Sequence, residues 1–172
     1  IAPSPSGEHL AFTVMGDLYV VNAPGGTPRR LSQPDAVTSM PAWSPDGQRI
    51  VFVTYSQEEG GHLYSVKTNG TDLERLTDQA AFYTEPVWSL DGNRIVAIRA
   101  PRRTYEEALT QNVQRGSSDL IWLPSEGGDA TLIAQGSGLR KPHFSQQVDR
   151  IYATQNGTGL VSIRWDGSDR RE

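Results

Sequence analysis

The stretch that decides the fold is Trp43-Ser44-Pro45-Asp46-Gly47-Gln48-Arg49-Ile50-Val51-Phe52. It returns 45 residues later as Trp88-Ser89-Leu90-Asp91-Gly92-Asn93-Arg94-Ile95-Val96-Ala97, and residues 4–12 and 144–153 are degenerate copies. A second half-pattern follows each copy, at residues 17–21, 62–66, 119–123 and 159–163, and each then meets a turn with Gly25, Gly70, Gly127 or Gly167. Two half-motifs in one order across four units indicate an internal repeat.

Each unit is predicted to form four short strands. Ser-Pro-Asp-Gly combines a proline with fixed φ and a glycine that tolerates positive φ, which favours a tight hairpin. The runs 50–53 and 95–98 are apolar at successive positions, as in a strand with both faces buried. Four-stranded repeats of about 40–45 residues are typical of β-propeller blades. The fold class is therefore all-β, with four antiparallel units at about 1–40, 41–85, 86–141 and 142–172, the terminal ones incomplete.

Composition excludes several classes of protein. The chain has 172 residues, a formal net charge of −4 and no cysteine, so disulfide frameworks, thiolate metal sites and cysteine nucleophiles are excluded. It has 14 Arg but 2 Lys, with no cationic run longer than two residues, which argues against a nucleic-acid-binding surface. No apolar run approaches the roughly 20 residues of a membrane span.

The third unit has an extra stretch through 99–117, where Thr104 and Glu107 have the spacing of a capping box and predict a short helix.

Binding residues concentrate on variable loops that a rigid scaffold holds. Such loops are expected at 32–40, 54–61, 77–85, 99–117 and 134–141, all on one face. We expect a mixed aromatic and charged surface for a polar or peptidic ligand, with these candidates: Tyr55, Glu58, Glu59, Tyr83, Glu85, Arg99, Arg102, Arg103, Tyr105, Arg140 and, facing the axial channel from an innermost strand, His143. Ordinary solvated loop residues are the competing interpretation.

No catalytic or metal-binding constellation is predicted. His9, His62 and His143 lie in different units without the spacing of metal ligands. The recurrent serines are turn residues, and no nucleophile elbow is present. Adjacent carboxylates such as Glu58 and Glu59 diverge, whereas acid/base catalysis needs convergent groups. We expect no cofactor, and the chain itself does not reveal whether its parent protein is an enzyme.

The pattern Pro-x-aromatic-Ser-Pro-Asp-Gly-x-x-Ile-x-Phe, followed by Leu-Tyr-x-Val and a glycine turn ending in Arg-Leu-Thr, resembles the TolB-type propeller repeat. It is nearly complete over 41–77 and continues with Leu90 in place of proline and with an eroded turn at 146–149. Residues 16–31 and 58–63 most resemble the propeller portions of large bacterial amidohydrolases. The family's propellers usually close with six or seven blades, so the resemblance implies part of a larger ring.

The resemblance implies two main functions. One is a non-catalytic segment that gates substrate for, or is accessory to, an amidohydrolase- or oligopeptidase-like hydrolase. The alternative is a free-standing TolB-like propeller that binds a protein or peptide at the bacterial envelope; a sugar-acid lyase acting within the propeller is a third hypothesis. The implied partners are the rest of the propeller, a C-terminal hydrolase domain, a protein or peptide ligand, or a second copy through open sheet edges. The implied location is periplasmic or secreted.

Overall fold

The computed structural model describes residues 1–31, 34–101, 118–145 and 149–172, which form four antiparallel sheets and no helix. The first sheet contains β1 (Ala2–Pro3), β2 (His9–Val14), β3 (Asp17–Asn22) and β4 (Arg29–Arg30). The second contains β5 (Val37–Trp43), β6 (Arg49–Ser56), β7 (Gly60–Lys67) and β8 (Glu74–Arg75). The third contains β9 (Phe82–Trp88), β10 (Arg94–Ala100), β11 (Asp119–Pro124) and β12 (Thr131–Ala134), and the fourth β13 (Leu139–Phe144), β14 (Arg150–Gln155) and β15 (Gly159–Arg164).

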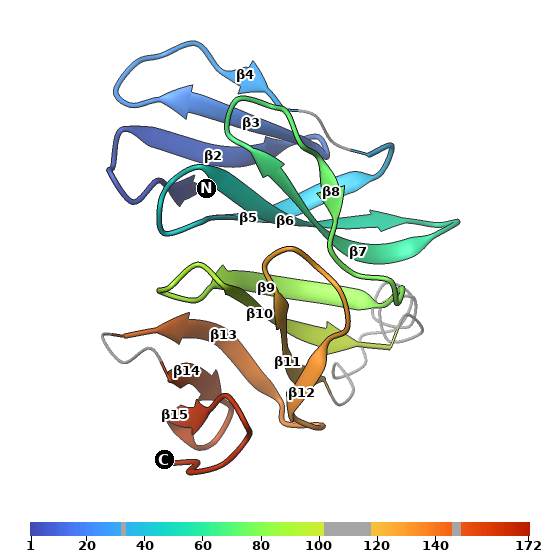
Figure 1. Cartoon of the computed structure of the whole chain (residues 1–172), viewed down its shortest axis with the longest axis vertical. Helices are drawn as coiled ribbons and strands as arrows, with labels where there is room; N and C mark the ends of the chain where they lie inside the picture. Colours follow the sequence, from blue (N-terminus) through green and yellow to red (C-terminus); the bar gives the residue numbers. More distant parts are fainter. Residues whose placement is uncertain (32–33, 102–117, 146–148) are drawn as a thin grey trace.

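The four sheets follow one another in chain order from top to bottom of Figure 1. In each sheet the strands also pair in chain order, so every connection within a sheet joins neighbouring strands. The fourth sheet has three strands, and an isolated bridge between Ser162 and Arg171 lies where a fourth would pair. The predicted all-β partial propeller is confirmed.

The recurrent hairpin turn is held by its serine and aspartate. The Ser44 hydroxyl accepts a bond from the Arg49 amide (2.9 Å) and donates to Asp46 Oδ1 (2.5 Å), which also accepts from the Gln48 amide (3.0 Å). Gly47 has φ of 71°, which favours glycine. The turn of the third sheet repeats every one of these bonds from Ser89.

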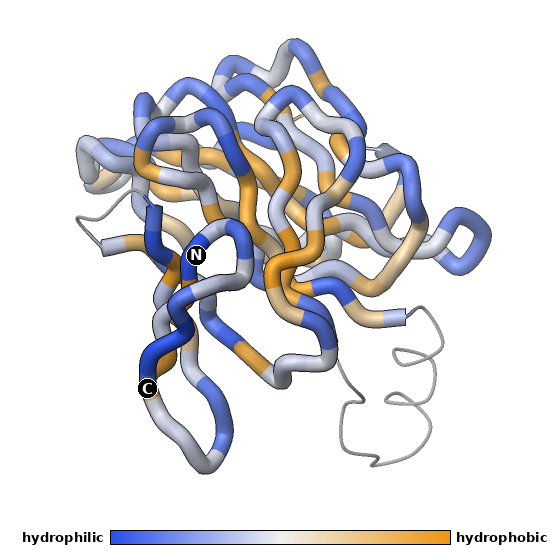
Figure 2. The backbone as a smooth tube through the Cα atoms, turned by 60° about the horizontal axis from the view of Figure 1, so that its bottom comes forward, coloured by the Kyte–Doolittle hydropathy of each residue, from blue (hydrophilic) through white to orange (hydrophobic). Residues whose placement is uncertain are grey.

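Apolar side chains fill the spaces between successive sheets. Alternate residues of the central strands face opposite neighbours, so Ile50 and Phe52 pack toward the first sheet while Val51 and Val53 pack toward the third. Both faces of these strands are therefore buried, as the continuous apolar runs predict. Figure 2 shows hydrophobic segments in the strands and hydrophilic segments in most turns.

In the second and third sheets, a tryptophan of the inner strand bonds to the inner strand of the preceding sheet. The indole Nε1 of Trp43 donates to the Ala2 carbonyl (2.9 Å), and that of Trp88 donates to the Ala42 carbonyl (3.1 Å). The two acceptors occupy the same position of the repeat. The fourth sheet has Phe144 at the tryptophan position, and phenylalanine has no group to donate such a bond.

The glycine turns after β11 and β15 seat against the previous sheet. A Cβ on Gly127 would lie 3.1 Å from the Leu76 backbone, and one on Gly167 would lie 2.4 Å from the Ile133 carbonyl oxygen. Both glycines have positive φ, 93° and 80°. The recurrent glycine thus serves both the turn and the contact between sheets.

The inner strands begin at Val37, Phe82 and Leu139, three or four residues before the unit limits predicted at 41, 86 and 142, because each strand continues past a bulge toward the preceding connection. The helix predicted near Thr104 lies outside the described residues.

Candidate functional site

The inner strands carry a row of three equivalent residues, Met40, Glu85 and Lys141, which we call the inner row. All three have a left-handed backbone, with φ of 52°, 55° and 52°. Each lies where the pairing of its strand with the next shifts register, so it forms a β-bulge. Bulges reorient side chains and free a backbone N–H from the ladder, and they often occur at functional sites.

Side chains of the inner row link one sheet to the next. The Glu85 amide donates to Met40 Sδ (3.2 Å), and the Lys141 amide donates to Glu85 Oε2 (2.6 Å). The bulge amide of one sheet is thus satisfied by the bulge side chain of the sheet before it. A carboxylate that accepts a backbone amide bond is well oriented, so Glu85 is the fixed acidic group of the row.

β13 carries two cationic residues, Arg140 and Lys141, where the Lys141 amide meets this carboxylate. Arg140 and Lys141 are exposed, and within the described ranges neither takes part in an ion pair. His143 is also exposed; its Nδ1 lies 3.0 Å from the Lys141 carbonyl oxygen, and its ring stacks on Tyr152 at 5.9 Å. Of the predicted site residues, the structure therefore groups Glu85, Arg140 and His143 on adjacent inner strands.

The predicted loop residues Tyr55, Glu58 and Glu59 lie elsewhere, around the connection between β6 and β7. Glu58, Glu59 and the buried His62 line a cavity of about 570 Å³. His62 Nδ1 lies 3.0 Å from the Thr77 carbonyl oxygen. Burial lowers the pKa of His62, and the bond to Thr77 opposes this shift less strongly.

Two predicted residues have structural partners. Tyr83 is 1% exposed and belongs to the core, and its hydroxyl donates to the Gln79 carbonyl (2.8 Å). The prediction that Tyr83 lies on a surface loop is wrong, because β9 begins at Phe82. Arg99 pairs with Asp119 at 3.2 Å. Arg102, Arg103 and Tyr105 lie outside the described residues.

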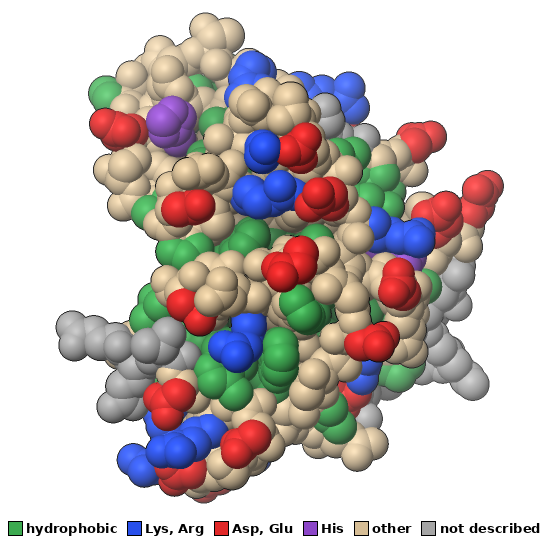
Figure 3. Space-filling view, viewed as in Figure 1, with side chains coloured by type: hydrophobic (Ala, Val, Ile, Leu, Met, Phe, Trp, Pro, Cys, Tyr) green, Lys and Arg blue, Asp and Glu red, His purple; other side chains and the backbone are tan. Residues whose placement is uncertain are grey.

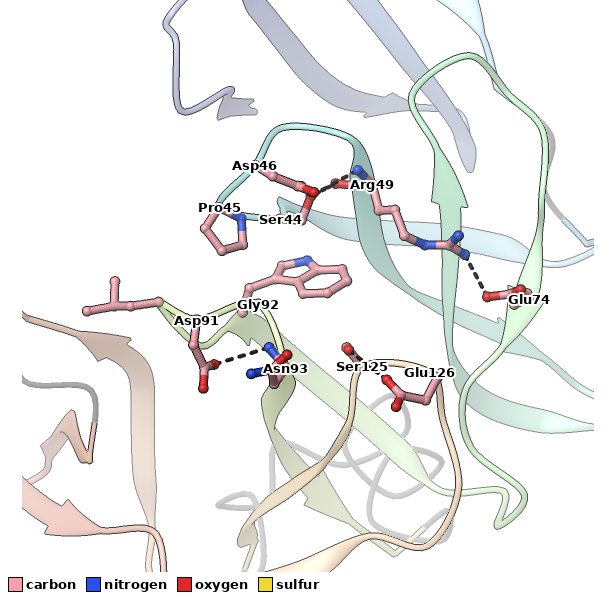
Figure 4. Close-up of a pocket in the computed structure, with 12 residues that line it drawn as sticks. Ser44, Pro45, Asp46, Arg49, Glu74, Asp91, Gly92, Asn93, Ser125 and Glu126 are labelled. Carbon is pink, nitrogen blue, oxygen red and sulfur yellow. Dashed lines mark hydrogen bonds and ion pairs between the residues drawn. The ribbon is translucent and has the colours of Figure 1, made fainter.

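A groove opens between the second and third sheets on the side of the hairpin turns. Its volume is about 650 Å³, and its lining includes Arg49, Glu74, Trp88, Ser125 and Glu126. Figure 4 shows the Arg49–Glu74 ion pair on one wall, with Ser125 and Glu126 on the facing turn. Acidic and basic side chains lie close together on the face seen in Figure 3, with apolar atoms between them.

Sequence reasoning found Glu85 but missed the other two members of the inner row. Met40 and Lys141 occupy the same position of the repeat as Glu85, directly before a proline. This shared position before a proline is the sequence signal from which the other two members of the inner row could have been predicted. The groove was also missed, because its lining comes from turns far apart in the sequence.

A family model described as the TolB beta propeller domain matches residues 1–132. This chain belongs to that family. No curated protein sequence matches it significantly.

Solved structures support the same propeller fold for this TolB-family chain. TolB from Acinetobacter baumannii is 18% identical with a TM-score of 0.74, and the match covers 98% of this chain and 41% of that one. A putative TolB from Agrobacterium tumefaciens is 21% identical with a TM-score of 0.62, covering 79% and 50%. An oligogalacturonate lyase from Vibrio parahaemolyticus is 17% identical with a TM-score of 0.72, covering 99% and 50%. The chain thus spans at most half the length of these proteins.

Residues 1–31, 34–101, 118–145 and 149–172 include no membrane-spanning helix. In the same part of the chain, no group of three His, Asp or Glu residues is placed to hold a metal ion.

Proposed function

We propose that this chain is a non-catalytic propeller segment that binds a polar or peptidic ligand at the inner row. It acts as a substrate-gating or accessory domain of a larger hydrolase that is amidohydrolase- or oligopeptidase-like. The observation that carries the proposal is the grouping of a fixed carboxylate with exposed cations. Glu85 is oriented by the Lys141 amide, and Arg140 and Lys141 are exposed beside it without an ion pair among the described residues.

A peptide suits such a surface because it presents both charges and both kinds of hydrogen-bonding group. Its carboxylate or carbonyl groups would meet Arg140 and Lys141, and its amine or N–H groups would meet Glu85. The bulges support a binding role, because β-bulges and left-handed non-glycine residues occur preferentially at functional sites.

The proposed partners are the rest of the propeller and a C-terminal hydrolase domain. The chain spans 41% to 50% of the solved structures compared above, which supports a longer assembly. The open sheet edges also suit pairing with a second copy of the chain, which size-exclusion chromatography with light scattering would detect. The proposed location is the bacterial periplasm or outside the cell, and membership of the family supports it.

The second candidate is a free-standing TolB-like propeller that binds a protein or peptide at the envelope. The family match and the two neighbours named TolB favour it. The two candidates differ in the parent polypeptide rather than in this segment.

Intact mass and a peptide map of the native protein separate the candidates. A continuation into a domain with the ligand set of a metal hydrolase supports the accessory role, and a polypeptide that contains only further repeats supports the free-standing propeller. In the first case, Arg140→Ala with Lys141→Ala should raise KM for a peptide substrate by about tenfold with kcat unchanged, since only binding is lost. An unchanged KM would contradict ligand binding at the inner row.

A further inference from the structure

The three grooves between successive sheets, on the side of the hairpin turns, differ in what fills them. Between the third and fourth sheets, Trp165 occupies the groove. Its ring lies 5.3 Å from that of Phe144 and 6.0 Å from that of Trp122, and the Arg94 guanidinium lies 5.1 Å from its centroid. An aromatic side chain from the turn after β15 therefore completes this groove by packing on an aromatic ring and a cation.

The groove between the second and third sheets keeps the arginine and the inner-strand aromatic residue without that side chain, and Ser65 takes the repeat position of Trp122. Arg49 occupies the repeat position of Arg94, and Trp88 that of Phe144, as the strand registers show. Ser125 of the third sheet has the same repeat position as Trp165 of the fourth. Ser125 directly follows Pro124, the partner of Arg94. Trp165 directly follows Arg164, the partner of Arg150.

The turns that carry Ser125 and Trp165 have the same geometry. The Gly127 amide donates to the Pro124 carbonyl at 3.0 Å, and the Gly167 amide donates to the Arg164 carbonyl at 2.9 Å. Both glycines seat against the preceding sheet. The Trp165 indole fills the groove between the third and fourth sheets. The short Ser125 side chain leaves the equivalent space open between the second and third sheets, where the volume is about 650 Å³.

Three hydrogen bonds hold the guanidinium of Arg49 at the wall of the groove. Its N–H groups bond to Ser65 Oγ (2.6 Å), the Asp72 carbonyl (3.0 Å) and Glu74 Oε2 (2.7 Å), and its side chain remains 22% exposed. Bonds in the plane of a guanidinium leave its flat faces for aromatic rings.

The mouth of the groove is acidic. Asp46, Glu74, Asp91 and Glu126 line it and are exposed, and Arg49 is the one basic residue in the lining described. Basic groups flanking an inserted ring would complement this charge.

From these observations we propose that the groove between the second and third sheets is a docking site for an aromatic residue, tryptophan above all, carried by a basic segment of a partner protein. The ring takes the place that Trp165 takes in the neighbouring groove. It packs beside Trp88 and stacks on Arg49, while lysine or arginine residues on either side face the carboxylates.

Three capped tripeptides test the chemistry by NMR titration of the intact protein: acetyl-Lys-Trp-Lys-amide, acetyl-Lys-Ala-Lys-amide and acetyl-Glu-Trp-Glu-amide. The first should bind at least about tenfold more tightly than either of the others, a ratio that corresponds to about 1.4 kcal/mol. Equal binding of the alanine peptide would overturn the aromatic anchor, and equal binding of the glutamate peptide would overturn the basic flanks.

Two variants place the binding in this groove. Ser125→Trp should fill it and weaken the Lys-Trp-Lys peptide at least about tenfold. Thr68→Trp is the matched control, because Thr68 has the same repeat position but lines the groove between the first and second sheets; it should leave the affinity within about twofold.

A third variant keeps the test valid if Ser125→Trp does not fold. Glu126→Lys changes the charge at the exposed mouth without filling the groove, so it should weaken the Lys-Trp-Lys peptide and strengthen the Glu-Trp-Glu peptide. Unchanged affinities in this variant, or undiminished binding to a folded Ser125→Trp variant, would place the peptide elsewhere.

Discussion

Replacement of Trp88 by alanine should destabilise the protein by about 3–6 kcal/mol. Trp88 is 7% exposed. An aromatic side chain buries about 150–250 Å², worth roughly 4–6 kcal/mol at about 25 cal/mol per Å², and residual burial in the unfolded chain reduces this by about 10–40%. Loss of the bond to the Ala42 carbonyl adds about 1 kcal/mol.

The assay is urea unfolding followed by far-UV circular dichroism. Trp88→Phe keeps most of the apolar contact and loses the indole bond, so it should cost only about 1–2 kcal/mol. Leu90→Ala is the matched control, because Leu90 is 46% exposed in the adjacent turn and should change stability by less than about 1 kcal/mol. An unfolding midpoint for Trp88→Ala equal to that of the wild type would refute the role of this indole between the sheets.

Three other perturbations test the turns and the buried histidine. Gly47→Val places a β-branched residue at φ of 71° and should cost at least about 1–2 kcal/mol; an unchanged unfolding midpoint would show that the turn relaxes. The Ser44 hydroxyl, and then the Gln48 amide, lower the pKa of Asp46, so its stabilising contribution is present above about pH 3.9 and is lost as pH falls through the lower folded-state pKa. Asp46→Asn should therefore reduce the acid dependence of unfolding below about pH 4, and an identical acid profile would contradict this assignment. Burial lowers the pKa of His62, so stability should fall as pH drops from about 6.5 through the folded-state pKa; His62→Gln should flatten this slope, and a slope of equal size would assign it to another group.

The hairpins and the burial pattern could be predicted because they depend on neighbours in sequence. Ser44 and Asp46 act within their own turn, and Gly47 needs only its local backbone conformation. The run from Ile50 to Val53 predicts burial on both faces without knowledge of what covers it. These features repeat, and repetition predicts stacked sheets.

The candidate sites were less accessible to sequence reasoning. Glu85 was expected on a loop, but its role depends on a bulge within β9 and on the Lys141 amide of the next sheet. Tyr83 was expected at the surface and is buried, because a residue one position into a strand can face either the solvent or the core.

By itself, the sequence determined the repeat, the all-β class and the turns, since short-range chemistry and period decide them. The tertiary structure alone decided which repeat positions meet across sheets. Trp165 fills one groove, whereas Ser125 leaves its counterpart open, and these two residues lie 40 positions apart in sequence. The reason is physical: a groove forms from the relative placement of two sheets, and no local pattern encodes the space between them.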